Sequence, residues 1–212
     1  MKKIMFSERY GLEQAVLAGT KTMTRRIIPD IEIDWNRRGR VTLPVSGFGH
    51  GVLFMDVRSI LHDAGICDYS APAKYQPKYE VGEEVAIAQA YQTLRWPALP
   101  GIDWKAITDE VTHSKGWTNK MFVKAEYMPH RIRITGIKVE RLQDISEEDC
   151  LREGLLAGEQ EPRMYGFRLP KGTVLSFLTP REAFAALIDR ISGRGTWQSN
   201  PWVYAYTFEL IK

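Results

Sequence analysis

The sequence predicts one α+β domain built around a small β-barrel of mixed topology, with short flanking helices and long loop insertions. Three observations lead to this fold class. The length of 212 residues suits a single domain. A chain with 44% hydrophobic and 26% charged residues is typical of a soluble globular protein. The predicted strands and short helices also lack the regular alternation of βαβ units, which favours a mixed barrel.

The predicted elements of the first half are short. Residues 1–6 form a candidate strand, and Ser7 can cap a helix that Gly19 ends. Residues 21–28 alternate only loosely and end at Pro29, so a loop or extended chain is expected there. The other elements expected in this half are two strands, at 52–57 and 85–91, and a short helix near 104–111.

The second half carries a stronger strand pattern. Residues 121–126 form a candidate strand. Residues 131–135 alternate strictly, and the predicted strand continues to Leu142 with Gly136 as a bulge or bend. Ser146 then begins a short helix with an acidic first turn, and Gly154 stops it. Acidic side chains there suit the positive end of a helix dipole.

The clearest helix signal begins at Thr179. This residue caps the helix, Pro180 takes the first helical position, and Glu182 completes a capping box. Gly193 ends the helix, and residues 202–210 alternate as a final strand. We therefore interpret residues 1–212 as a single domain, with insertions at about 30–78, 92–120 and 155–179.

The net charge of +3 conceals an uneven distribution of charged residues. Residues 1–29 hold six lysines and arginines against two glutamates, whereas residues 144–153 hold five acids and one arginine. A basic cluster attracts phosphate even when the total charge is small, although a solvated surface explains such a run equally simply.

Several classes of protein are disfavoured by the composition. Two cysteines are too few for a disulfide scaffold or a four-cysteine zinc site, and the four histidines lack metal-ligand spacing. We therefore expect no metal and no cofactor. The apolar runs are far shorter than the roughly 20 residues of a membrane span, and no signal peptide is evident, so a cytoplasmic protein is expected.

The segment that follows the first helix is the richest in chemistry. It reads Gly19-Thr20-Lys21-Thr22-Met23-Thr24-Arg25-Arg26. A lysine that is desolvated beside arginines has a lowered pKa, so Lys21 could accept the proton of the Thr24 hydroxyl and make it a nucleophile. The arginines could hold a phosphate or a carbonyl oxygen. A solvated basic loop is the simpler alternative for the same residues.

Other residues are candidates for contact with nucleic acid. Trp35 lies beside two arginines and could stack on a base, although most aromatic side chains belong to the core. Arg131 and Arg133 begin a further basic cluster that could contact phosphates.

Four separated blocks of the sequence, in order, resemble the ASCH domain (activating signal cointegrator homology domain), of the phage and bacterial type. The pattern Gly-x-Lys-x-x-Thr-x-Arg after a short helix is similar to the signature of that family. The other blocks that are similar to the family are Tyr79 to Val85, Ile137 to Asp149 followed by Glu153-Gly154, and Asn200-Pro201-Trp202-Val203 with Phe208-Glu209.

This resemblance implies a PUA-like β-barrel that binds RNA or a nucleotide in a cleft lined by the Lys-Thr-Arg motif. Some small ASCH proteins are amidohydrolases that act on N4-acetylcytidine with a lysine, a threonine and a glutamate. The positions of this sequence that match these three family residues are Lys21, Thr24 and Glu153. The resemblance implies that Lys21 is the base, Thr24 the nucleophile and Glu153 the proton donor to the leaving amine.

The same resemblance suggests residues that contact the substrate. Arg26 would anchor a substrate oxygen or phosphate, with Arg25 and Thr22 as its neighbours. One departure is that the family's Arg-Glu pair is replaced here by Ala88 and Gln89.

Three functions remain open on the sequence. The chain could be an RNA- or nucleotide-binding protein without catalysis, an amidohydrolase on an acylated nucleoside, or a metal-dependent ribonuclease. Acids between residues 144 and 149 could hold a divalent ion for the last of these, but their capping role explains them more simply.

Overall fold

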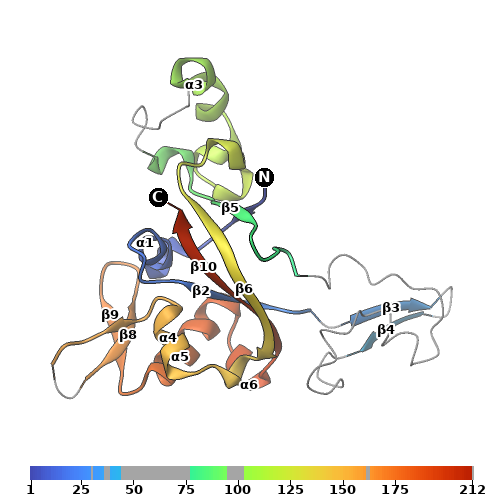
Figure 1. Ribbon diagram of the computed structural model, residues 1–212, viewed down its shortest axis with the longest axis vertical. Coiled ribbons are helices and arrows are strands. Elements are labelled where there is room, and N and C mark those ends of the chain that lie inside the picture. The colour runs from blue at the N-terminus through green and yellow to red at the C-terminus, as the bar shows by residue number, and fades with distance from the viewer. Residues whose placement is uncertain (30, 36–38, 44–76, 95–102, 161–162, 212) are drawn as a thin grey trace.

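The protein is an α+β structure. In the computed structural model, the described residues are 1–29, 31–35, 39–43, 77–94, 103–160, 163–211. Their strands form sheets of five, two and three strands, accompanied by short helices (Figure 1). The predicted strand at 52–57 lies outside the described residues.

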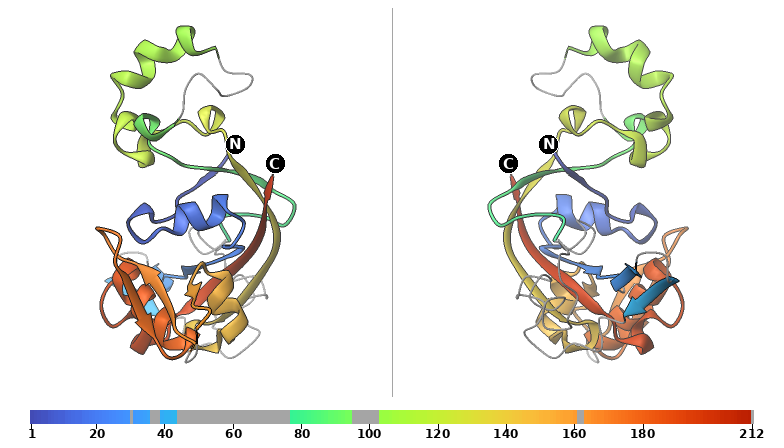
Figure 2. Two further views of the ribbon diagram at one scale, coloured as in Figure 1. Left: turned by 90° about the vertical axis from the view of Figure 1, so that its left-hand side faces the viewer. Right: turned by 90° about the vertical axis from the view of Figure 1, so that its right-hand side faces the viewer.

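The five-stranded sheet is the centre of the fold. Its strands, in spatial order, are β1 (Lys3–Ile4), β5 (Glu84–Ile87), β6 (Arg131–Arg141), β10 (Trp202–Ile211) and β2 (Met23–Ile27). Strand β1 is parallel to β5, and the other pairs are antiparallel. The long strands β6 and β10 curve together through the molecule (Figure 2). Among the described residues, the strands form no closed barrel.

Gly136 marks an irregularity in the long β6–β10 pair, as expected. The register shifts between Thr207 and Phe208, directly beside the pairing of Gly136 with Thr207. A Cβ atom at Gly136 would lie 2.7 Å from Thr207 Oγ1, so a larger residue there would force the Thr207 side chain to move.

Strand β2 was not evident from the local pattern, which predicted loop or extended chain. Its residues pair with the distant strand β10, and Thr24 lies opposite Tyr206 while Arg26 lies opposite Tyr204. The hydrogen bonds that hold this strand come from a segment about 180 residues later in the chain, so the local alternation could not reveal them.

The helices follow the predicted caps with one exception. Gly11, with φ of +71°, separates a 3-10 turn from helix α1, where a continuous helix from Ser7 was expected. Ser146 Oγ accepts a hydrogen bond from the Asp149 amide, and Thr179 forms the predicted capping box with Glu182. The helices are α1 (Leu12–Leu17), α3 (Trp104–Thr112), α4 (Glu147–Arg152), α5 (Pro180–Ser192) and α6 (Thr196–Ser199).

The predicted insertions contain more structure than loops. The third one forms an antiparallel sheet, and the first one contains a hairpin. The predicted strand at 121–126 is wrong, because 3-10 turns at Lys120–Phe122 and Ala125–Tyr127 occupy that segment. The additional strands are β3 (Ile31–Trp35), β4 (Gly39–Leu43), β7 (Leu156–Ala157), β8 (Tyr165–Arg168) and β9 (Val174–Phe177).

Two hydrophobic cores are found among the described residues and support these elements. The larger one packs one face of α5, including Phe184 and Leu187, with α1 and the central strands. The smaller one joins the end of β5 to the segment that carries α3, around Tyr91 and Val111. None of the described helices combines the length and apolar character that a membrane span requires.

Candidate active site

The link between α1 and β2 is fastened to the end of α4. The Thr22 amide donates to the Arg152 carbonyl at 2.9 Å, which places Lys21 beside the last turn of α4. Gly154 follows that turn with φ of +95°, and a Cβ there would lie 3.2 Å from the Lys21 Cβ. The glycine that stops α4 therefore also makes room for the lysine.

Lys21 and Glu153 form a buried pair. Lys21 Nζ lies 2.6 Å from Glu153 Oε2 and donates to the Glu153 carbonyl at 2.7 Å. The two residues are only 2% and 5% exposed. Burial lowers the pKa of the Lys21 amine, and Arg26 and Arg25 add to this effect while Glu153 opposes it. Because its pKa is lowered, the Lys21 amine loses its proton more readily than the amine of an exposed lysine does.

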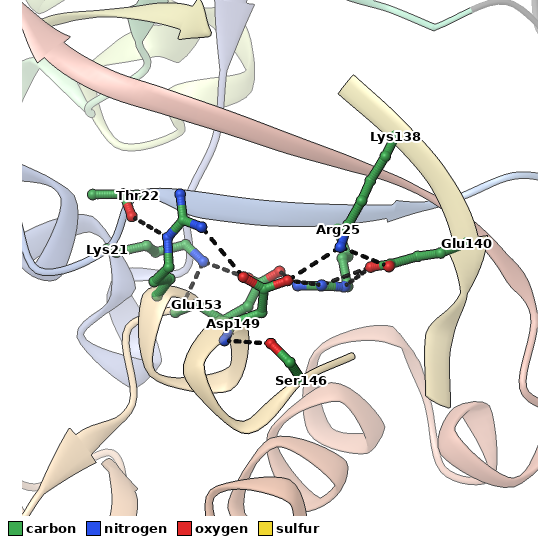
Figure 3. Close-up of polar contacts among 9 residues, drawn as sticks. Lys21, Thr22, Arg25, Lys138, Glu140, Ser146, Asp149 and Glu153 are labelled. Carbon is green, nitrogen blue, oxygen red and sulfur yellow. Dashed lines mark hydrogen bonds and ion pairs between the residues drawn. The ribbon is translucent and has the colours of Figure 1, made fainter. Parts of the chain in front are cut away.

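Arg25 connects this pair to two further carboxylates (Figure 3). Its Nη1 donates to Glu153 Oε1 at 3.0 Å, and its Nε donates to Glu140 Oε1 at 2.8 Å. Its Nη2 donates to Asp149 Oδ2 at 3.2 Å, and Lys138 contacts the same oxygen at 3.2 Å. Burial alone would lower the pKa of Arg25, but Glu153 and Glu140 raise it, so the guanidinium stays charged.

We refer to these residues as the charge cluster. Its members lie in β2 or just before it, in β6, and in α4 or directly after it. They are Lys21, Arg25, Lys138, Glu140, Asp149 and Glu153.

A pocket of about 270 Å³ opens against the charge cluster. Thr24 contributes to its lining, and in the part of the chain that the structure describes the Thr24 hydroxyl has no hydrogen-bond partner. One face of α5 supplies an apolar wall through Phe184, Leu187 and Ile188. This pocket, which we name the first pocket, combines a free hydroxyl, a buried amine and an apolar surface.

Five of the nine site residues suggested by the sequence line the first pocket. All of them come from the segment after α1 or from the end of α4. They are Lys21, Thr24, Arg25, Arg26 and Glu153.

The other four lie elsewhere. The Thr22 hydroxyl accepts a hydrogen bond from Arg152 Nε at 3.2 Å and does not line the first pocket. Arg131 and Arg133 belong to β6 and also do not line it, and exposed Arg133 pairs with Glu84 at 3.0 Å. Trp35 ends β3, in the two-stranded sheet, and its side chain is outside the described parts.

Sequence reasoning missed the role of Glu140 and Lys138. These residues are two positions apart on β6, so they share one face of the strand and both reach the charge cluster. The alternating pattern of β6 was visible in the sequence. The sequence did not show which face of the strand lies toward Arg25.

Asp149 is the acid of α4 that pairs with cations among the described residues. Asp149 contacts Arg25 and Lys138 at 3.2 Å and Arg152 at 3.3 Å. Among the described residues, no three His, Cys, Asp or Glu side chains converge as a metal-binding group. Burial raises the pKa of the neighbouring Cys150 thiol to about 12, which makes that thiol a poor nucleophile.

Comparison with protein-family models, curated proteins and solved structures finds no significant match to this chain.

Proposed function

We propose that this protein is an amidohydrolase that acts on an acylated nucleoside, with N4-acetylcytidine as the model substrate. One observation carries the proposal: the buried Lys21–Glu153 pair lies at a pocket that is also lined by the Thr24 hydroxyl, which has no hydrogen-bond partner among the described residues. These are the three residues that the resemblance to ASCH amidohydrolases assigns to catalysis.

Burial suits Lys21 to the role of base, because it lowers the pKa of the Lys21 amine. In the proposed reaction the proton between Lys21 Nζ and Glu153 Oε2, which lie 2.6 Å apart, moves to the carboxylate and leaves a neutral amine. The amine can then accept a proton while the carboxyl group can donate one.

The proposed reaction has two steps. In the first, Thr24 Oγ bonds to the amide carbon while Lys21 takes its proton, and the carbon–nitrogen bond breaks as Glu153 protonates the leaving amine. In the second, water attacks the acyl-threonine and gives a proton to Glu153, while Lys21 returns its proton to Thr24 Oγ. The products are the free acid and the amine, and the three side chains regain their starting forms.

The proposal also includes the fold family of this protein and the chemical class of its ligand. We propose that the curved five-stranded sheet represents a PUA-like barrel of the ASCH family, and that the ligand is a nucleoside, a nucleotide or RNA. The order of the four sequence blocks supports this assignment, as does the position of the Lys-Thr-Arg motif at a pocket.

The test is release of acetate from N4-acetylcytidine by wild type and by a matched pair of variants. Thr24→Ser keeps the hydroxyl, whereas Thr24→Val removes it with little change of shape. We expect Thr24→Ser to retain turnover and Thr24→Val to lose at least about a hundredfold. Lys21→Arg should lose a similar factor, because a guanidinium is not deprotonated in proteins.

Two results would contradict the proposal. Equal turnover by Thr24→Val and wild type would exclude the nucleophile, and no turnover by wild type would exclude this substrate. Binding of RNA or a nucleotide without any turnover would favour the non-catalytic binding protein instead.

A further inference from the structure

A second pocket of about 250 Å³ adjoins the first pocket. The two pockets share Met5, Arg26 and Ile27, so Arg26 stands at their junction. The described residues that line the second pocket include three tyrosines and two cations, and no carboxylate is among them. We name it the tyrosine pocket, and its polar and aromatic residues are Arg26, Lys78, Tyr79, Tyr204 and Tyr206.

Strand pairing and backbone hydrogen bonds build this pocket. The antiparallel register places Tyr204 opposite Arg26 and Tyr206 opposite Thr24. The Tyr206 hydroxyl accepts from the Lys78 amide at 3.0 Å, and the Tyr79 hydroxyl donates to the Lys3 carbonyl at 2.9 Å. These contacts fix two of the rings as walls of the pocket. Burial also raises the pKa of Tyr79 to about 12, so this wall is uncharged at neutral pH.

Arg26 and Lys78 differ from the cations of the charge cluster. Lys21 and Arg25 are paired with carboxylates, whereas neither Arg26 nor Lys78 forms an ion pair within the described residues. Arg26 donates from Nη2 to the Met5 carbonyl at 2.8 Å, and within the described residues its other N–H donors form no further hydrogen bond. The Lys78 ammonium lies 5.4 Å from the centre of the Tyr79 ring. Among the described residues, the tyrosine pocket therefore presents two positive charges that no carboxylate pairs with.

We infer that Arg26 and Lys78 bind a phosphate group of the substrate whose amide enters the first pocket. This inference rests on the proposed function and narrows its substrate class from a free nucleoside to a nucleotide. Guanidinium and ammonium groups form charge-assisted hydrogen bonds with phosphate oxygens, and tyrosine walls suit a sugar or base next to them.

The dimensions of the two pockets support a shared ligand. Each pocket alone is smaller than the roughly 300–1,000 Å³ typical of small-molecule sites, whereas the two together fall within that range. Thr24 and Arg26 are two residues apart on β2, a separation of about 7 Å along a strand. A ligand that reacts at Thr24 therefore has Arg26 within reach of its next group.

The test measures binding by calorimetry, so that it does not depend on catalysis. Cytidine, cytidine 5′-monophosphate, a short cytidine-containing oligoribonucleotide and inorganic phosphate are titrated into wild type, Arg26→Ala, Lys78→Ala and Lys105→Ala. Lys105 is an exposed lysine of α3 outside both pockets and serves as the matched control.

We expect wild type to bind the monophosphate about tenfold more tightly than cytidine at low salt. This ratio should fall to nearly one in Arg26→Ala and Lys78→Ala and should persist in Lys105→Ala. Tighter binding of the oligoribonucleotide than of the monophosphate would identify a phosphodiester of RNA as the source of the anion. The reverse order would identify the terminal phosphate of a free nucleotide.

Equal affinity of wild type for cytidine and its monophosphate would overturn the inference. The inference would also fail if Lys78→Ala kept the wild-type ratio of the two affinities. The absence of binding by every probe, phosphate included, would also overturn it. Failure of the proposed function gives a different result: N4-acetylcytidine is not hydrolysed, yet the monophosphate still binds more tightly than cytidine.

Discussion

At the scale of single residues, Arg25 holds the charge cluster together. Its side chain contacts Glu140, Asp149 and Glu153, and it is only 1% exposed. Arg25→Met would leave buried carboxylates without their shared cation, so we expect the free energy of unfolding to fall by about 3 kcal/mol or more. Exposed Arg133 also bridges two carboxylates, and Arg133→Met should cost less than about 1 kcal/mol. Urea denaturation measures both, and equal losses would contradict a central role for Arg25.

Asp149 makes the contribution of the charge cluster to stability depend on pH in the acid range. Burial alone would raise the pKa of Asp149, but hydrogen bonds and charges from Lys138 and Arg25 outweigh burial and lower it. The unfolded chain therefore takes up this proton at higher pH than the folded chain does. The stabilisation is complete above the unfolded pKa of about 3.9 and disappears as pH falls through the folded value.

We accordingly expect the unfolding free energy of wild type to decline as pH falls below about 4. Asp149→Asn should be less stable at neutral pH and should decline less steeply in that acid range. Asp109→Asn, at an exposed position of α3, is the control and should keep the wild-type slope. Equal slopes for wild type and Asp149→Asn in urea titrations would refute the role of Asp149.

At the scale of secondary-structure elements, the end of α4 positions the amine of the first pocket. A Cβ at Gly154 would meet the Cβ atoms of Lys21 and Ala15 at 3.2 and 3.3 Å, in addition to the strain of φ at +95°. Gly172 has φ of +87° and nothing within 4 Å of such a Cβ, so Gly172→Ala isolates the backbone strain.

Both alanine variants should lose about 1–2 kcal/mol of stability from the left-handed backbone. Gly154→Ala should in addition lose most of its hydrolysis of N4-acetylcytidine, because Lys21 must shift. Thermal unfolding and the acetate-release assay measure these two effects separately. Retention of full turnover by folded Gly154→Ala would show that the position of Lys21 is not determined by this contact.

At the scale of the whole molecule, the segment with α3 lies at the opposite end from α4 and α5 (Figure 1). Lys120 fastens it to the N-terminal region, because its Nζ contacts the carboxylates of Glu13 at 3.0 Å and Glu8 at 2.9 Å. Lys120 Nζ also donates to the Phe6 carbonyl. This attachment is separate from the charge cluster.

We expect Lys120→Met to loosen this end of the molecule while α5 keeps its protection. The loss should be about 1–3 kcal/mol, because Glu13 is buried whereas Lys120 is partly exposed. Lys124→Met, which removes an exposed pair with Glu110, should have almost no effect. Hydrogen exchange over residues 104–128 measures the loosening, and unchanged exchange in Lys120→Met would contradict the attachment.

Features that depend on neighbouring residues could be predicted from the amino-acid sequence. The caps at Ser146 and Thr179, the irregularity at Gly136 and the mixture of strands with short helices follow from patterns a few residues long, and the structure confirms them. The motif from Lys21 to Arg26 was also visible as a dense group of reactive side chains.

The partners of these side chains became evident from the folded structure alone. β2 exists because β10 pairs with it, and the same register sets Arg26 beside the tyrosine pocket. Lys21 meets Glu153 across 132 residues of chain, and Arg25 meets Glu140 on a strand whose inward face local alternation could not assign. Short-range patterns report local backbone preference, whereas the contacts that shift a pKa or leave a cation unpaired depend on long-range packing.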